Sequence, residues 1–477
     1  MSELLDRRSP TVPSGAFGEL PIAYACAGCG YRAPVDRPVP MRCPRARPDD
    51  DIDHVLGRVP DMTRLRFPTG LEANPFIRYR TLSHAYHVAR ALGWTDADYV
   101  ALVERIDAAI AAVDGAGFRV TPMARHAALS DRLGFERHGG VLVKDETGNV
   151  SGSHKARHLM GTLLELEVAD AFEGRREYRR LAIASCGNAA LAAAVVAAAA
   201  GRELDVFIPT DANPAVVTRL MDLGAQVTVC ERQPGVAGDP TVRELSTAIE
   251  AGAIPFTCQS NANGFAVEGG LTLGYELVAD LAANGTTVDR LFVQVGGGAL
   301  ASACLQGIAE ARSLGATTSN PIVHPVQAEA VAPLARAYER LVHRLDTDTP
   351  TDTDVVWAAR HRSAFMWPWE AEPHSIASGI LDDETYDWLA IVRGTLASHG
   401  WPVVVDEATL LEANEIARST TGIDVDPTGS AGLAGLLALR RHGRVAASET
   451  VAVIFTGIRR GVAPVAESPA SQLGAPS

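Results

Sequence analysis

Lysine is nearly absent from this chain. Of its 43 lysine and arginine residues only two, Lys144 and Lys155, are lysines, so almost every cation is an arginine. A coding bias toward GC-rich codons produces such a composition by itself. A primary amine that forms an imine with a carbonyl compound, however, cannot be replaced by a guanidinium group. The two remaining lysines are therefore the first positions to consider for amine chemistry.

Other absences exclude whole classes of protein. The longest apolar run, residues 189–200, is too short to span a bilayer, and no apolar signal core follows the charged N-terminus. With a formal net charge of −14 and no basic stripe, nothing favours nucleic-acid binding. The seven cysteines are scattered and odd in number. We therefore expect a cytoplasmic protein with reduced thiols.

The hydrophobic pattern predicts an α/β protein. The 477 residues are 47% hydrophobic, which suggests two or more domains. A helical region is expected over residues 74–112, and from residue 141 short apolar strands alternate with helices. Strands are expected at 141–143, 181–184, 205–208, 225–229, 254–257, 291–295, 322–327 and 451–455, with helices at 155–172, from 189, 213 and 241, and at 265–281 and 300–313. Such units build parallel sheets whose ligands gather at the carboxyl ends of the strands.

The first candidate site follows the strand at 141–143. A polar, glycine-containing loop ends in Ser153-His154-Lys155, and Lys155 opens a helix. Free N–H groups and the positive end of the helix dipole lower the pKa of a neighbouring amine, which suits a lysine that must be deprotonated to form an imine. A surface lysine at a helix start is the alternative. Arg157, shortly after it, either binds a substrate anion or pairs with Asp145 or Glu146.

Two further loops join a strand to a helix. Ser185-Cys186-Gly187-Asn188 offers backbone N–H groups to a carboxylate and an amide side chain at the same place. Gly296-Gly297-Gly298-Ala299-Leu300 lets the backbone approach a phosphate at a helix start. It lacks both the dinucleotide fingerprint and the P-loop lysine, so a phosphate monoester is favoured over NAD or ATP. Ordinary turns remain the alternative for both loops.

In this order, the motifs resemble those of the tryptophan synthase β / threonine synthase superfamily of pyridoxal 5′-phosphate (PLP) enzymes, called fold type II. Ser153-His154-Lys155 resembles the tryptophan synthase β motif, whereas threonine synthases and dehydratases usually have Phe where His154 stands. Ser375-Ile376-Ala377-Ser378-Gly379-Ile380 and Asp426-Pro427-Thr428-Gly429 resemble two stretches of dehydratases. The resemblance covers residues 119–460.

The resemblance implies a role for each matching residue. Lys155 is expected to hold PLP as a Schiff base and then to remove the substrate α-proton. Thr456 is expected to face the pyridine nitrogen, and a neutral hydroxyl there suits elimination and replacement better than transamination. The other expected contacts are the phosphate with His154, Gly296, Gly297, Gly298, Ala299 and Leu300, the ring 3′-oxygen with Asn188, and the substrate carboxylate with Ser153, Ser185, Cys186 and Gly187.

The N-terminal segment carries a possible metal knuckle. Cys26 and Cys29 form a CxxC pair, and residues 20–44 resemble the zinc-ribbon-like segment that begins many threonine synthase-like chains. A complete ribbon needs four ligands, but Cys43 has no CxxC partner, and His54 lies at an unusual spacing. A degenerate, metal-free remnant is the interpretation favoured here, with zinc on Cys26, Cys29 and Cys43 as the alternative.

The fold expected is that of fold type II, with PLP between two parallel-sheet domains and a homodimer as assembly. Residues 1–70 form an extension, 71–155 with 270–465 the larger domain, 156–269 the smaller domain and 466–477 a flexible tail. The reaction expected is β-elimination or β-replacement on a small serine- or threonine-like amino acid. A threonine synthase acting on a phosphorylated amino acid is the runner-up, a tryptophan synthase is disfavoured, and a non-catalytic metal-binding interaction protein is the alternative of another class.

Overall fold

The computed structural model describes residues 19–47, 49–175, 177–232, 239–345, 351–371 and 373–460, without the side chain of Asp352. The tail expected at 466–477 lies outside these residues. Within them the chain forms a six-stranded sheet, a four-stranded sheet and a two-stranded sheet. The strands are β1 (Ile22–Cys26), β2 (Leu56–Pro60), β3 (Met123–Arg125), β4 (Gly140–Asp145), β5 (Leu181–Ala184), β6 (Leu204–Pro209), β7 (Gln226–Cys230), β8 (Ile254–Pro255), β9 (Arg290–Gln294), β10 (Ile322–Ala328), β11 (Val403–Val405) and β12 (Thr450–Phe455).

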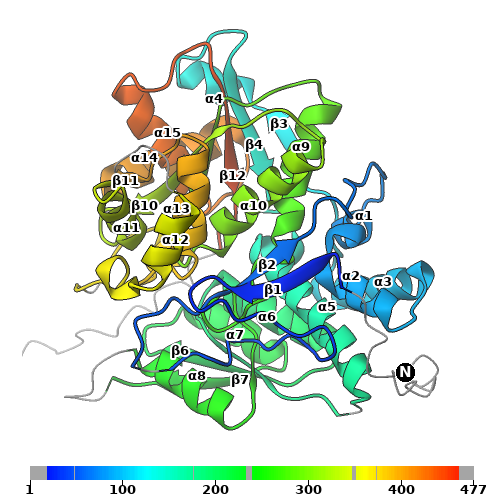
Figure 1. Ribbon diagram of the computed structural model, residues 1–477. Helices are drawn as coiled ribbons and strands as arrows, with labels where there is room; N and C mark the ends of the chain where they lie inside the picture. Colours follow the sequence, from blue (N-terminus) through cyan, green and yellow to red (C-terminus); the bar gives the residue numbers. More distant parts are fainter. Residues whose placement is uncertain are drawn as a thin grey trace, which may run out of the picture.

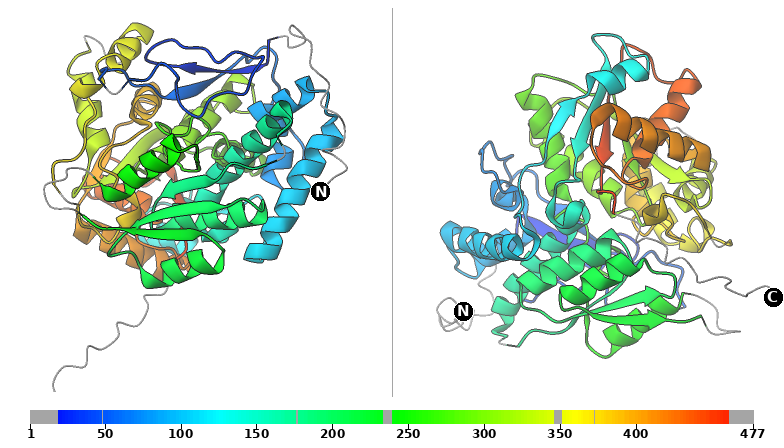
Figure 2. Two further views of the ribbon diagram at one scale, coloured as in Figure 1. Left: turned by 90° about the horizontal axis from the view of Figure 1, so that it is seen from below. Right: turned by 180° about the vertical axis from the view of Figure 1, so that it is seen from behind.

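The larger sheet has the order β11-β10-β9-β12-β4-β3, and all its pairs are parallel except β3 with β4. The smaller sheet, β7-β6-β5-β8, is entirely parallel. The predicted α/β class with parallel sheets is therefore confirmed. In the right-hand view of Figure 2 the orange C-terminal helices lie over the larger sheet, and the green smaller sheet lies below it.

Helices cover both faces of the larger sheet. One hydrophobic core joins β9 to α9, α10, α11 and α13, and a second joins β12 and β10 to α4, α14 and α15. No described helix is both long and apolar enough to cross a membrane. The helices are α1 (Pro75–Arg78), α2 (His84–Ala91), α3 (Asp96–Asp114), α4 (Ala127–Arg132), α5 (Lys155–Glu173), α6 (Asn188–Ala199), α7 (Pro214–Asp222), α8 (Pro240–Glu250), α9 (Leu271–Ala283), α10 (Ala299–Ser313), α11 (Pro333–Val342), α12 (Asp352–Ala359), α13 (Trp388–Ala397), α14 (Glu407–Thr421) and α15 (Ala431–Arg441).

Two predicted helices have different bounds in the structure. The helical region at 74–112 is divided at Gly93 (φ +86°), after which Thr95 and Asp98 form a capping box that starts α3. The helix expected from residue 265 begins only at Leu271. A Cβ added to Gly269 would lie 1.7 Å from the carbonyl oxygen of Arg157, so the turn before α9 packs directly against the backbone of α5.

The N-terminal part of the chain is placed differently from the expected domain division. Residues 71–155 are expected in the larger domain, but α2 and α3 share one core with α5, α6 and the smaller sheet. The physical reason is that the apolar side of α3, with Leu102, Ile106 and Ile110, is covered by this core. Strands β1 and β2 cross the front of the boundary between the two larger sheets (Figure 1).

Candidate functional site

The loop after β12 carries Thr456, and a glutamine from the neighbouring strand holds its hydroxyl. Gln294, the last residue of β9, donates from Nε2 to Thr456 Oγ1 (2.8 Å). The same Nε2 lies 2.8 Å from the carbonyl oxygen of Gly429 and 3.2 Å from that of Ile454. These carbonyl oxygens fix the amide nitrogen in place, so Thr456 Oγ1 is an acceptor here. Its own proton remains available for another acceptor.

The residues before Lys155 are tied to the same strand end. The backbone N–H of His154 donates to the carbonyl oxygen of Thr456 (3.0 Å), and Ser153 forms an antiparallel bridge with Gly457. The His154 ring nitrogen Nδ1 lies 3.2 Å from the same Thr456 oxygen. Burial, with the charge of Lys155, holds the pKa of His154 well below its usual range. The imidazole is therefore neutral near pH 7 and offers a hydrogen bond, not a positive charge.

Lys155 begins α5, and its charge acts on acidic side chains that the motifs did not predict. Burial raises the pKa of Asp387 to about 7, and the charge of Lys155 acts against this rise. Asp382 has its pKa raised in the same way, again with Lys155 as an opposing charge. Both carboxyl groups belong to the segment between β10 and α13, shortly after the quoted stretch at 375–380 but not within it. The surroundings of Lys155 are thus more acidic than its own loop suggests.

This segment also closes over the glycine loop that follows β9. Gly297 N–H donates to Asp382 Oδ2 (2.9 Å), and Thr385 Oγ1 donates to the carbonyl oxygen of Gly296 (3.0 Å). The N–H of Asp387 donates to the carbonyl oxygen of Gly297 (3.2 Å). A Cβ on Gly296 would lie 2.3 Å from Asp382 Oδ2 and 2.9 Å from Ile380 Cα, so a side chain there would displace this segment. The loop therefore already directs one N–H group toward an anion.

The end of the glycine loop leads straight into α10. Gly298 has φ +103°, in the left-handed region, and a Cβ on it would lie 2.7 Å from Ile391 Cδ1. Ala299 and Leu300, both buried, form the first turn of the helix. Their backbone N–H groups belong to the positive end of the helix dipole. The donor set at this corner suits a phosphate group.

Asn188 begins α6 and is oriented by an arginine near the end of the described chain. Its Oδ1 accepts hydrogen bonds from Arg460 Nε (3.1 Å) and Nη2 (3.0 Å), while its Nδ2 lies 3.4 Å from Asp426 Oδ2. Burial raises the pKa of Asp426 to about 6. Arg460 Nη2 also donates to the carbonyl oxygen of Ser151 (2.6 Å). Arg460 therefore turns the amide N–H₂ of Asn188 away from itself.

The expected carboxylate loop enters the site as the turn that precedes Asn188. Ser185, Cys186 and Gly187 are half-buried, and Gly187 N–H lies 3.4 Å from Ser185 Oγ. Burial raises the pKa of the Cys186 thiol, which leaves it protonated and unreactive near neutral pH. This loop therefore provides small side chains and backbone N–H donors rather than a reactive group.

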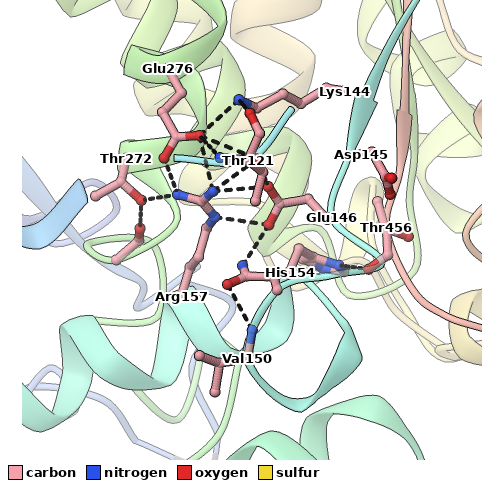
Figure 3. A network of polar contacts seen from close by, with 12 residues as sticks. Thr121, Lys144, Asp145, Glu146, Val150, His154, Arg157, Thr272, Glu276 and Thr456 are labelled. Atoms are coloured by element: carbon pink, nitrogen blue, oxygen red, sulfur yellow. Dashed lines mark hydrogen bonds and ion pairs between the residues drawn. The ribbon is translucent and has the colours of Figure 1, made fainter. Parts of the chain in front are cut away.

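Arg157 lies in a buried network of charges (Figure 3). It forms ion pairs with Glu146 (2.8 Å) and Glu276 (2.6 Å), and all three side chains are fully buried. Lys144 Nζ lies 2.8 Å from both Glu276 and Asp280. The alternative of an Arg157 paired with a neighbouring acid is thus observed with Glu146. Of the two lysines, Lys144 has a structural position, while Lys155 lies beside the acidic segment that contacts the glycine loop.

The N-terminal cysteines converge with a histidine. Sγ of Cys26, Cys29 and Cys43 and a ring nitrogen of His54 all lie within 4.8 Å of one another. The sequence alone indicates an incomplete ligand set, because His54 follows Cys43 at an unusual spacing. The structure corrects this point, because the loop directly before β2 returns His54 to the three cysteines.

The geometry can be compared with known proteins. The sequence model of the family described as pyridoxal-phosphate dependent enzyme matches residues 116–457, more than half of the chain. A threonine synthase of Methanosarcina acetivorans is 26% identical over 342 residues, which cover 71% of this chain and 74% of that protein.

Solved structures of low sequence identity share the fold. A threonine deaminase isoform of Solanum lycopersicum aligns with a TM-score of 0.54 at 16% identity, covering 77% of this chain and 91% of that one. A diaminopropionate ammonia lyase of Escherichia coli aligns with a TM-score of 0.55 at 17% identity, covering 76% and 88%. These two likenesses support the fold type II architecture.

Proposed function

Because this chain belongs to the family of pyridoxal-phosphate dependent enzymes and uses PLP as its cofactor, we propose that it catalyses β-elimination or β-replacement on a small serine- or threonine-like amino acid. The observation that carries the proposal is the hydroxyl of Thr456. Its proton is free to donate because Gln294 occupies its oxygen as a donor. A neutral donor at this place suits a ring nitrogen without a proton, whereas a carboxylate would keep that nitrogen protonated.

The side chains at the corner fit PLP. When bound, PLP withdraws electrons from the α-carbon of an amino acid. Lys155 would hold the cofactor and afterwards move the α-proton at its Nζ, and the Asn188 amide would donate to the ring 3′-oxygen. Gly296, Gly297 and the first turn of α10 would bind the phosphate. Since Asp382 accepts the Gly297 N–H, its carboxylate has to release this donor to the phosphate.

The remaining residues position the substrate and its leaving group. The backbone of Ser185, Cys186 and Gly187 would bind the substrate carboxylate next to Asn188, and Ser153, fully buried beside Gly457, would line the same side. The acidic pair Asp382 and Asp387 can hold a proton close to Lys155, because burial favours their neutral forms. A leaving hydroxyl needs such a proton to depart as water.

The absorption spectrum tests this proposal. The purified protein is expected to show the visible band of a PLP Schiff base, and Lys155→Ala is expected to lose it. Addition of serine, threonine and other small amino acids should shift the band, with release of a keto acid and ammonia for at least one of them. A visible band that no member of this panel shifts would contradict the proposed substrate class.

The second candidate is a threonine synthase-like replacement on a phosphorylated amino acid, favoured by the curated relative of that name. Such a substrate needs cations for its phosphate. Arg157, the cation considered for this purpose, is fully engaged by Glu146 and Glu276. Release of inorganic phosphate from a phosphorylated amino acid, in place of keto acid from serine or threonine, would decide for this candidate.

We also propose that the enzyme works as a cytoplasmic homodimer, as the family resemblance implies. Light scattering coupled to size-exclusion chromatography measures the assembly directly. A mass of one chain at working concentration would contradict the dimer.

A further inference from the structure

We infer that Cys26, Cys29, Cys43 and His54 bind one structural zinc ion, and that this ion stabilises the segment that covers the glycine loop. The Cys26 Sγ and His54 Nδ1 atoms are 3.6 Å apart, as are the Cys29 and Cys43 Sγ atoms. Ligand atoms at about 2.0–2.3 Å from a tetrahedral zinc lie about 3.4–3.8 Å from one another. The spacing of both pairs is therefore that of a zinc ligand set.

The surroundings of the four ligands support the same ion. His54 Nε2 lies 2.9 Å from Asp50 Oδ2, so a carboxylate orients the ring and leaves Nδ1 for the metal. Cys26 and Cys43 are buried, with 2% and 3% of their surfaces exposed, as in a closed structural site. Three thiolates and one imidazole favour zinc over hard cations such as Mg²⁺ or Ca²⁺.

Glycine at position 28 shows how tightly the two ligand loops fit. A Cβ on Gly28, inside the CxxC knuckle, would lie 2.4 Å from Ile52 Cγ2 and 2.8 Å from the carbonyl oxygen of Asp53. The knuckle therefore packs directly on the loop that carries His54. The Cys26 and Cys43 side chains continue into a small hydrophobic core with Leu56 and Phe265.

The same loops bind the chain that follows α12. Arg360 Nε donates to the carbonyl oxygen of Gly28 (3.2 Å), and Asp53 N–H donates to that of Ala359 (2.7 Å). Arg362 N–H donates to the carbonyl oxygen of Asp51 (3.1 Å). Both ligand loops are thus attached to residues 359–362 through hydrogen bonds to the backbone, which a change in the knuckle would disturb.

Arg362 extends this attachment to the active-site segment. Its guanidinium lies 3.5 Å from Asp53 Oδ1 and 2.8 Å from Glu384 Oε2. Glu384 stands between Asp382 and Thr385, whose side chains contact the glycine loop. A continuous series of contacts therefore runs from the ligand loops to the phosphate-binding corner. The ion holds its own loops together, and through Arg362 it restrains the segment 382–387.

Metal content tests the site itself. Wild-type protein produced with zinc in the medium and purified without chelators is expected to contain about one zinc per chain by elemental analysis. Cys29→Ser should lose most of it, whereas Cys230→Ser, which changes a cysteine of β7 outside the cluster, should keep it. Zinc-free wild type, another metal in its place, or equal zinc in Cys29→Ser and wild type would overturn the site. If Cys29→Ser does not fold, the zinc released from wild type by chelation and thiol modification gives the same answer.

Hydrogen exchange tests the coupling, with no need for catalytic activity, so its outcome is independent of the proposed reaction. In zinc-depleted protein the amides of residues 382–387 are expected to exchange at least about tenfold faster than in the zinc-loaded form, while those of β6 stay unchanged. Arg362→Met should retain zinc and yet show the faster exchange of this segment. Equal exchange of residues 382–387 with and without zinc would overturn the coupling.

Discussion

At the scale of the residue, the catalytic candidates are oriented by partners that no motif contains. Gln294 sets the hydroxyl of Thr456, and Arg460 sets the amide of Asn188. Each partner uses a fixed donor geometry, so the candidate side chain is left with one direction for its remaining hydrogen bond. This preorganisation lowers the cost of ordering the site when its ligand binds.

Arg460 can be tested against its neighbour. Arg460→Met is expected to weaken PLP binding about tenfold or more, because a hydrogen bond from a charged donor contributes about 1.5–3 kcal/mol and Arg460 makes two to Asn188. Fluorescence titration of the cofactor-free protein measures the dissociation constant. Arg459→Met is the matched control, since Arg459 pairs with the exposed Asp424 and should have little effect. Equal affinity of Arg460→Met and wild type would contradict an orienting role for this arginine.

The buried His158 gives a pH-dependent prediction. Burial lowers its pKa to about 3, whereas an unfolded chain has an ordinary histidine value of about 6.5. The unfolded state therefore binds a proton first, and the free energy of unfolding falls as pH drops from about 6.5 toward 3, by up to about 1.4 kcal/mol per pH unit from this group. His158→Gln keeps a donor for the carbonyl oxygen of Ala266, which His158 Nδ1 approaches to 2.6 Å. Denaturant unfolding at pH 7 and pH 5 should show a smaller loss in the variant; an equal loss would contradict the neutral buried ring.

At the scale of the element, the segment between β10 and α13 competes for the glycine loop. Asp382 accepts the Gly297 N–H that a phosphate needs, and so competes with the phosphate for this donor. Asp382→Ala is therefore expected to tighten PLP binding several-fold, as measured by the same fluorescence titration. Asp383→Ala, which alters an exposed neighbour, is the control. Weaker binding in Asp382→Ala would mean that this carboxylate supports the cofactor.

At the scale of the whole molecule, Arg157 connects the helix that follows the active-site loop with the strand and helix of the larger sheet. Arg157→Met would leave Glu146 and Glu276 buried with one cation fewer, a change that costs about 3–5 kcal/mol. Thermal or denaturant unfolding of the cofactor-free protein measures this loss. The control Arg441→Met removes a largely exposed ion pair with Glu412 and should cost at most about 1 kcal/mol. Similar losses in the two variants would contradict the proposed weight of the buried network.

The sequence predicts elements and loops well where the signal is local. The glycine loop, Asn188 and Lys155 each follow a strand and open a helix, so their positions could be predicted from hydrophobic spacing and turn residues. Arg460, Asp382 and Gln294 could not, because their contacts join residues far apart in the chain and depend on which strands are neighbours. The position of His54 beside the cysteines could not be predicted for a related reason. Sequence spacing does not show that a loop brings a distant ligand back to the other three.

The scarcity of lysine has a practical consequence in this fold. Lys144 is fully buried among Glu276, Asp280 and the carbonyl oxygen of Thr121, and the only other lysine of the sequence is Lys155. An acylating reagent that seeks side-chain amines therefore meets one accessible target in the folded protein. A label attached there would report on a single position of the molecule. The degree of labelling would measure the fraction of chains whose Lys155 holds no cofactor.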